Sequence, residues 1–246
     1  MPGVEITIPG NIHYATFYNR PNRFLVNLTL EGTKHLEQAY LHDPGRMKEL
    51  LLPQVRLLIR QPQPKNGTNK RKTKWDILAV EHQNRIVAIN SQLPNIVAAN
   101  ILKKKKLPEL KEYTLVRPEI SYGNSRLDFY LKKDTNECYL EVKGVTLVAE
   151  KKALFPDAPT TRGVRHLKEL MKIRQEGKKA VVLFLVMRED PSTFGPNETT
   201  DPIFTQTLLQ AYKSGVEILV YKVKPILQNK KLVLQFGEKI NWSGTI

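Results

Sequence analysis

Two carboxylates and a lysine in the second half of the chain have the types and spacing of a metal-dependent hydrolytic centre. Glu141 and Lys143 are two residues apart in an apolar segment that is typical of a buried strand, so their side chains would point to the same face. Asp128 ends the segment Tyr122-Gly-Asn-Ser-Arg-Leu-Asp128, upstream of that strand. Carboxylates bind hard divalent cations, a bound cation activates water beside a phosphate, and a lysine can orient that water. The set therefore predicts cleavage of a phosphodiester with Mg²⁺ or Mn²⁺.

The elements that must position this set are three predicted strands, at residues 114–120, 126–132 and 137–145. In a restriction-endonuclease-like hairpin, the aspartate begins one central strand and the Glu-x-Lys pattern lies on its antiparallel partner. We therefore expect Asp128 and Glu141 as metal ligands, the backbone carbonyl of Val142 as a further ligand, and Lys143 beside the attacking water. The apolar flanks favour this interpretation, because a buried charge is costly unless it is paired or binds metal. The alternative is a surface Glu-Lys ladder on an edge strand.

Glu119, near the end of the first of these strands, is a further candidate metal ligand. It is equally well explained as a structural partner of Arg117 or Arg126. Arg126 is itself a candidate nucleic-acid contact, since it lies two residues before Asp128.

A predicted helix from Thr161 to Gln175 follows the Glu-Lys strand and ends at Gly177. Arg162 and Arg165 share a face near its N-terminus, where backbone N–H groups already favour anions, so they could hold a phosphate. The alternative is a solvated helix face. His166 could assist proton transfer, although a single helix histidine is more often structural.

Residues 20–90 have the pattern of a small β-barrel. Short alternating runs separated by turn residues predict strands at 23–30, 37–42, 55–60, 75–81 and 85–90. A short helix at 45–52 would complete an oligonucleotide/oligosaccharide-binding (OB) barrel. The candidate nucleic-acid contacts in this part of the chain are the cations Arg46, Lys48, Arg71, Lys72 and Lys74. Trp75 beside them could stack on a base, or belong to the core.

After residue 90 the pattern changes to alternating helices and strands. Besides the elements already described, we expect helices at 94–103 and 202–214 and strands at 180–187 and 216–223. The strand at 180–187 is apolar throughout, which is typical of a central strand covered on both faces. This order predicts a mixed α/β sheet with helices on both sides. We therefore divide the chain into domains 1–90 and 91–246, with a last strand at 229–243 returning to the first domain.

The composition favours a polyanionic partner. The formal net charge is +15 over 246 residues, which favours DNA or RNA as the ligand and predicts salt-sensitive association. A basic proteome or an ion-paired surface is the alternative. No membrane span or export signal is recognisable, and the single cysteine, Cys138, fits a reducing cytoplasm. The sequence says nothing of the oligomeric state. Phosphate-binding loops, dinucleotide-binding glycine patterns, nucleophile elbows and zinc-protease motifs are absent from it.

Several ordered blocks together resemble the sugar fermentation stimulation protein A (SfsA) family. The blocks are Arg23-Phe-Leu, His42-Asp-Pro-Gly-Arg-Met-Lys-Glu-Leu-Leu, Arg71-Lys-Thr-Lys, Leu93-Pro-Asn95, Tyr122-Gly-x-Ser-Arg-x-Asp-Phe129, Tyr139-x-Glu-Val-Lys-Gly-Val-Thr146, Ala153-x-Phe-Pro-Asp-Ala-Pro-Thr160 and Arg188-Glu-Asp190. The resemblance implies an OB-type barrel followed by a nuclease-like (PD-(D/E)XK) α/β domain. It also implies DNA binding and a link to the regulation of sugar use. The segment after about Lys224 carries no recognisable family pattern.

Two functions therefore stand side by side for this chain. The first is a nucleic-acid-binding nuclease that uses Asp128, Glu141 and Lys143. The second is a non-catalytic, sequence-nonspecific DNA-binding regulator that retains the nuclease scaffold. A pure binder has no need for two clustered carboxylates beside a phosphate, which favours the first. An oligosaccharide-binding protein is the weakest alternative, because the sequence lacks an aromatic-rich cleft.

Overall fold

A closed barrel forms in the first third of the chain, and the computed structural model describes residues 4–62 and 73–242. The strands of this part are β2 (His13–Asn22), β3 (Leu25–Leu30), β4 (Leu36–Leu41), β5 (Arg56–Arg60), β6 (Trp75–His82) and β7 (Arg85–Ala88). They pair in the order β4-β3-β2-β5-β6-β7. Parallel pairing of β4 with β6 closes β2 to β6 into a barrel, and β7 extends it at β6. The predicted OB barrel is confirmed.

The segment 45–52 differs from the helix that we expected there. It forms consecutive turns, with the N–H groups of Leu50 and Leu51 both donating to the carbonyl of Met47. Met47 has a φ of 47°, in the left-handed region, and a helix cannot continue through such a residue. The cationic side chains of Arg46 and Lys48 are therefore presented on a loop. Strand β2 was not among the predicted strands either.

The rest of the chain is built on a second, larger sheet. Its strands, in spatial order, are β1 (Val4–Thr7), β16 (Lys231–Lys239), β15 (Glu217–Gln228), β13 (Lys179–Val186), β10 (Asn136–Val145), β9 (Ser125–Lys133) and β8 (Leu115–Tyr122). The central strands β10, β13 and β15 run parallel, and the outer pairings are antiparallel. The predicted mixed α/β sheet is confirmed.

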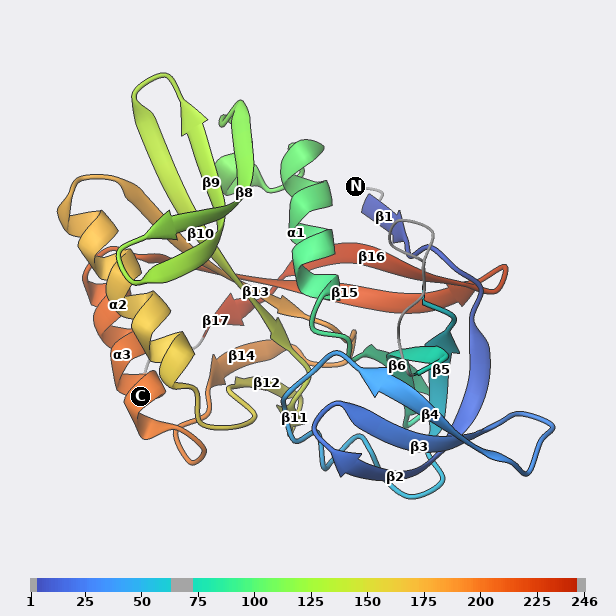
Figure 1. Ribbon diagram of the computed structural model, residues 1–246. Coiled ribbons are helices and arrows are strands. Elements are labelled where there is room, and N and C mark those ends of the chain that lie inside the picture. The colour runs from blue at the N-terminus through green and yellow to red at the C-terminus, as the bar shows by residue number, and fades with distance from the viewer. Residues whose placement is uncertain (1–3, 63–72, 243–246) are drawn as a thin grey trace.

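Helices cover both faces of this sheet. They are α1 (Leu93–Lys103), α2 (Thr161–Gln175) and α3 (Pro202–Lys213), with a short 3-10 helix at Pro108–Leu110. Val181 and Leu183 of β13 share one hydrophobic cluster with α1, while Val182 and Phe184 share another with α2 and α3. Figure 1 shows α1 apart from the α2–α3 pair, with the barrel at the lower right. No helix in the described part of the chain is long and apolar enough to cross a membrane.

A small third sheet, which was not predicted, lies beside the main one. It consists of β11 (Val148–Ala149), β12 (Lys152–Phe155), β14 (Thr193–Pro196) and β17 (Asn241–Trp242), in that order. β12 leads directly into the segment before α2, so this sheet fixes where the N-terminus of α2 begins (Figure 1).

The two ends of the described chain depart from the expected division at residue 90. β1 pairs with β16, so the first strand lies in the larger sheet and not in the barrel. β16 pairs with β15 as well, and β17 joins the small third sheet, so the segment after residue 229 does not return to the barrel. Our expectation for this segment was therefore wrong. Leu58 and Leu78 of the barrel belong to the same hydrophobic cluster as α1. The barrel and the α/β unit therefore pack on a shared core.

Candidate functional site

The β9–β10 hairpin opens at one end, and Asp128 lies at that opening. The ladder between the two strands ends at the pair Leu140↔Phe129. Just beyond it, one carboxylate oxygen of Asp128 accepts the backbone N–H of Val142 at 2.8 Å. The side chain takes the place of a strand carbonyl, which satisfies an N–H group that the diverging strands would otherwise leave unpaired. We call this opening, with Asp128, Glu141 and Lys143, the fork.

Glu141 is the most deeply buried member of the fork, with 3% of the residue exposed. Its Oε1 lies 2.5 Å from Nζ of Lys143, so the two side chains do share a face of β10. The same oxygen contacts Nδ1 of His166, a residue of α2 that is itself buried. A buried carboxylate needs such partners, because removing an ion from water costs several kcal/mol in real proteins. The surface-ladder alternative is inconsistent with this burial.

The other carboxylate oxygen of Glu141 is different. Oε2 is buried and has no hydrogen-bond partner within the described residues. Leaving a buried acceptor of this kind unsatisfied costs about 1–3 kcal/mol, and more when the group is charged. A carboxylate oxygen in this state could coordinate a hard cation.

The pKa values of the two carboxylates of the fork are shifted in opposite directions. Burial raises the pKa of Asp128, the neighbouring charge of Glu141 raises it further, and the hydrogen bonds from Val142 and Asn95 only partly offset this. Burial also acts to raise the pKa of Glu141, but Lys143 and His166 together lower it below its ordinary value. Two interacting acids with divergent pKa values are typical of functional sites.

Asn95 contacts the fork, and the sequence analysis assigned it no role. It lies in the first turn of α1, and its Nδ2 donates to Oδ1 of Asp128 at 2.8 Å. Close packing brings α1 here, because a Cβ added to Gly144 of β10 would come within 2.6 Å of Pro94. The sequence signals were its place in the block Leu93-Pro-Asn95 and a polar side chain directly after the proline that begins an apolar helix.

Three candidate residues of α2 lie near the fork. Thr160 caps this helix by accepting the N–H of Gly163 at 3.0 Å. Nε of Arg162 approaches Nε2 of His166 at 3.4 Å, and Nε of Arg165 lies 3.3 Å from Oγ of Ser125 at the start of β9. Both arginines remain exposed, while the contact of His166 with Glu141 joins α2 to the fork.

Glu119 does not join the acids of the fork. Its side chain is 67% exposed and lies 3.5 Å from Arg126, which is 62% exposed. The ion pair that we considered as the alternative is therefore the arrangement observed. Glu119 has a φ of 54°, which marks an irregular position in β8. This position lies opposite the strand segment that contains Asp128.

The cationic candidates of the barrel are only partly described. Arg46, Lys48 and Lys74 are exposed. Arg71 and Lys72 lie outside the described residues. Trp75 is 7% exposed, and its Nε1 donates to Glu37 at 2.8 Å, so it belongs to the core of the barrel and offers no stacking surface.

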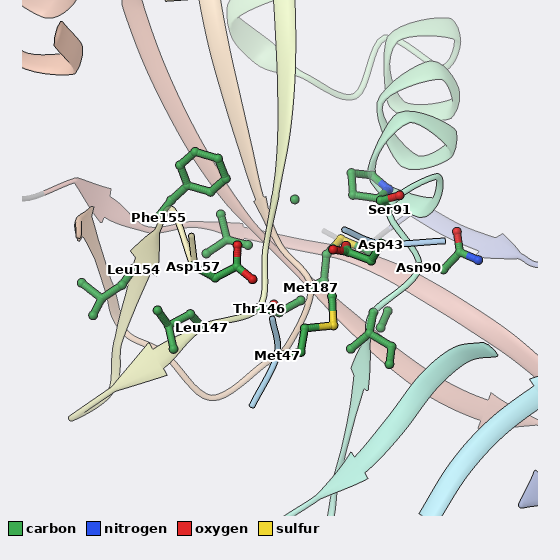
Figure 2. A pocket seen from close by; sticks show the side chains of 15 residues that line it. Asp43, Met47, Asn90, Ser91, Thr146, Leu147, Leu154, Phe155, Asp157 and Met187 are labelled. Atoms are coloured by element: carbon green, nitrogen blue, oxygen red, sulfur yellow. The ribbon is translucent and has the colours of Figure 1, made fainter. Parts of the chain in front are cut away.

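A cavity of about 90 Å³ lies where the barrel meets the α/β unit. In Figure 2, Asp43, Asn90 and Ser91 lie on one side of it, and Asp157 and Phe155 lie on the other. A Cβ on Gly45 would lie 2.3 Å from an oxygen of Asp157 and 2.8 Å from one of Asp43. The two carboxylates thus converge on the loop after β4. Burial raises the pKa of Asp43 to about 7, and the charge of Asp157 adds to that shift.

A hard divalent cation fits the fork, although the described residues contain no cluster of three His, Cys, Asp or Glu side chains suited to hold a metal alone. Mg²⁺ in phosphoryl-transfer sites is typically held by one or two carboxylates together with water and substrate phosphate. Asp128 and Glu141 supply two carboxylates, and Oε2 of Glu141 is a buried acceptor in need of a partner.

Comparison with known proteins supports both parts of this fold. Residues 19–89 match the family model described as the SfsA N-terminal OB domain, and residues 92–229 match the sugar fermentation stimulation protein RE domain. A sugar fermentation stimulation protein homolog of Methanosphaera stadtmanae is 42% identical over 226 residues, covering 92% of this chain and 93% of the relative. The homolog of Moorella thermoacetica is 43% identical over 218 residues, covering 88% of this chain and 92% of the relative.

A solved structure is similar over the whole length. The structure of Pyrococcus furiosus SfsA in complex with Ca²⁺ superposes with a TM-score of 0.86 and 26% identity, covering 99% of each chain.

Proposed function

The chain belongs to the sugar fermentation stimulation protein family, and from this premise we propose that it is a nucleic-acid-binding protein whose fork cleaves phosphodiester bonds with Mg²⁺ or Mn²⁺. The observation that carries the proposal is the buried Oε2 of Glu141, which has no partner in the described part of the chain, together with the electrostatic contact between Glu141 and Asp128. A protein that only bound a polyanion would gain nothing from two carboxylates at the binding face, since they repel phosphate.

In this proposal Asp128 and Glu141 would hold the cation, and the backbone carbonyl of Val142 would add a ligand. When bound, the cation lowers the pKa of a water molecule and offsets negative charge on the phosphate. Asn95 fixes the orientation of Asp128 through the hydrogen bond to Oδ1. His166 fixes Glu141 from α2. Lys143, now paired with Glu141 at 2.5 Å, is placed to orient the attacking water.

The Pyrococcus furiosus relative is described as a complex with Ca²⁺. Ca²⁺ and Mg²⁺ both prefer oxygen ligands, although Ca²⁺ accepts more of them in a looser geometry. Carried over to this chain, that complex supports a site for a hard divalent cation. The chemistry and burial of the fork carboxylates favour them as its ligands.

The binding surface in this proposal combines the cations of both units. Arg162 and Arg165 lie near the N-terminus of α2, where they would contact phosphates next to the fork. Arg126 at the hairpin, Arg46 and Lys48 on the barrel loop, and Lys74 before β6 extend this surface. Arg71 and Lys72, which lie outside the described residues, stay candidate contacts on the sequence alone. The net charge of +15 is consistent with a long anionic ligand, either DNA or RNA.

A second candidate function is binding without cleavage, as in a sequence-nonspecific DNA-binding regulator of sugar metabolism. The 2.5 Å ion pair between Lys143 and Glu141 favours it, because an ammonium held by a buried carboxylate is not free to orient water. Binding of a cation to Glu141 would compete for the same carboxylate and release Lys143. The two candidates therefore differ in whether a divalent cation reaches the fork.

Cleavage assays decide between them. The protein is incubated with single-stranded DNA, duplex DNA and RNA, with Mg²⁺, with Mn²⁺ and with a chelator. We expect cleavage in Mn²⁺ or Mg²⁺ that is lost in Asp128→Asn and in Lys143→Met. Lys222→Met is the matched control, because Lys222 also pairs with a glutamate of the same sheet at 2.5 Å, away from the fork.

Cleavage that persists in both fork variants would exclude the fork as the active site. If no polymer is cut with any cation, the non-catalytic function is favoured. Binding is measured in the same buffers, and an affinity that does not fall steeply with salt would contradict recognition of the phosphate backbone.

A further inference from the structure

The tip of the β2–β3 hairpin presents an aromatic ring to solvent. Phe24 lies at this tip and is 43% exposed. Its ring stacks on Tyr40 of β4, with centroids 6.0 Å apart and planes 13° from parallel. Tyr40 in turn meets His42 edge-to-face, with centroids 4.3 Å apart. The three rings form a short ladder that ends at Phe24.

The backbone holds this ring in place. Oδ1 of Asn22 accepts the N–H groups of Phe24 and Leu25 at 2.9 and 3.0 Å, which fixes the turn. The carbonyl of Phe24 accepts the N–H of Leu41 at 2.9 Å, so the tip is tied to β4. A preorganised ring loses little conformational entropy when it binds a partner, which favours affinity.

A row of amides continues the same face of the barrel. Nδ2 of Asn27 donates to Asn19 at 2.8 Å, and Nε2 of Gln38 donates to Asn27 at 3.3 Å. Gln38 and Tyr40 are two residues apart on β4, so the amide row and the aromatic ladder lie on one outward face. Amides offer donors and acceptors to base edges, and this face of an OB barrel is one on which oligonucleotides bind.

Two exposed arginines flank the tip that carries this ring, one in the chain and one on a neighbouring loop. Arg23 precedes Phe24 at the tip and is exposed, as is Arg46 on the neighbouring loop. The guanidinium of Arg20 joins these two places, because it donates to the carbonyls of Arg23 at 2.5 Å and of Gly45 at 2.7 Å. An exposed aromatic ring near cations is typical of a surface that stacks bases and tracks a phosphate backbone.

We propose that the outward face of β2, β3 and β4, ending at Phe24, binds an unpaired nucleic-acid strand and gives this protein a preference for single-stranded over duplex substrates. Bases in a duplex have both faces stacked on their neighbours and cannot reach a protruding ring, whereas an unpaired base can. The inference rests on the proposed function for the statement that the ligand is a nucleic acid.

The position of the tip supports delivery of that strand to the fork. Arg20 ties the tip to the loop at Gly45, and Gly45 is packed against Asp157. Asp157 is followed, three residues later, by Thr160, the N-cap of α2. This series of contacts therefore leads from the hairpin tip at Phe24, along the junction of the barrel and the α/β unit, to the helix that carries Arg162 and His166.

Binding in a chelator, where cleavage cannot occur, tests this face separately from the fork. Fluorescence anisotropy is measured for a labelled oligothymidylate and for a duplex of the same length. We expect Phe24→Ala to weaken binding of the single strand by about tenfold and binding of the duplex by less than about twofold. Phe24→Trp should bind the single strand at least as tightly as the wild type. Tyr212→Ala is the control, since Tyr212 is a 54% exposed aromatic on α3.

Equal weakening for both polymers, or no weakening of the single strand, would overturn the inference, and so would loss of binding in Phe24→Trp as large as in Phe24→Ala. Failure of the proposed function has a different signature. In that case wild-type protein cuts nothing in Mg²⁺ or Mn²⁺, while the strand preference and its loss in Phe24→Ala persist. Thermal melting of each variant checks that the barrel remains folded.

Discussion

Asp128 accepts the backbone N–H of Val142 at 2.8 Å, so one side chain both closes the end of a β-ladder and offers a carboxylate to the fork. These two tasks are separable by substitution. Asp128→Asn keeps an oxygen acceptor and removes the charge, whereas Asp128→Ala removes both. We expect the alanine variant to lose about 1–3 kcal/mol of unfolding free energy and the asparagine variant less than about 1 kcal/mol. Urea denaturation measures both, and titration with Mn²⁺ should show weakened binding in each. Equal stability of the two variants would mean that the Val142 bond contributes nothing.

Lys143 and Glu141 should be strongly coupled in stability. Lys143→Met leaves a buried carboxylate without its main counter-charge, and we expect a loss of about 3 kcal/mol. Adding Glu141→Gln to that variant removes the uncompensated charge and should recover most of the loss. A double-mutant cycle in urea gives the coupling energy. Additive effects would contradict the ion pair.

The lowered pKa of Glu141 gives this pair a definite pH dependence. An acid whose folded pKa is lowered contributes stability that is present above its ordinary pKa and is lost as the pH falls through the folded value. Wild-type protein should therefore lose stability on the acid side of the ordinary glutamate pKa of 4.5, and Glu141→Gln should show less of this loss. Denaturation curves over the acid range, compared between the two proteins, measure the difference.

Gly144 should be needed for the close approach of β10 and α1. A Cβ there would lie 2.6 Å from Pro94, so Gly144→Ala must displace the helix that carries Asn95. We expect a loss of about 1–3 kcal/mol together with weaker Mn²⁺ binding. Gly32→Ala is the matched control: its φ of 80° makes alanine unfavourable by about 1 kcal/mol, but nothing lies within 4 Å of the added Cβ. Normal Mn²⁺ binding in Gly144→Ala would show that α1 does not position the fork.

Asp43 should make the protein less stable as the pH rises. Its pKa is about 7 in the folded state, against an ordinary value of 3.8, because the group is buried and faces Asp157. Between these two values the folded state retains a proton that the unfolded state has released, so stability falls with rising pH and then levels off above about pH 7. Asp43→Asn should flatten this slope and be more stable than wild type at about pH 8, by on the order of 2 kcal/mol. Urea denaturation at several pH values measures the slope of stability against pH. Asp134→Asn, in the exposed β9–β10 turn, is the control. An unchanged slope would contradict the assignment to Asp43.

Local patterns in the sequence were sufficient to predict most of the helices and strands. The apolar run at 180–187 predicted a central strand, and β13 is buried on both faces. The helix predicted from Thr161 to Gln175 has those bounds as α2, because its N-cap and terminal glycine are local signals. Two-residue periodicity placed Glu141 and Lys143 on one face, and they are in contact there. The helix predicted at 45–52 was wrong, because the left-handed backbone at Met47 is not a preference of its sequence.

The amino-acid sequence by itself determined the OB barrel, the mixed α/β sheet and the types and spacing of the fork residues, since alternation, helix signals and charge are properties of neighbouring residues. Tertiary structure alone decided that Asn95 reaches Asp128, that His166 contacts Glu141, that β1 joins β16, and that the exposed ring is Phe24 while Trp75 is buried. Each of these depends on segments far apart in the chain. Such contacts follow from how helices and sheets pack, and no local pattern encodes that packing.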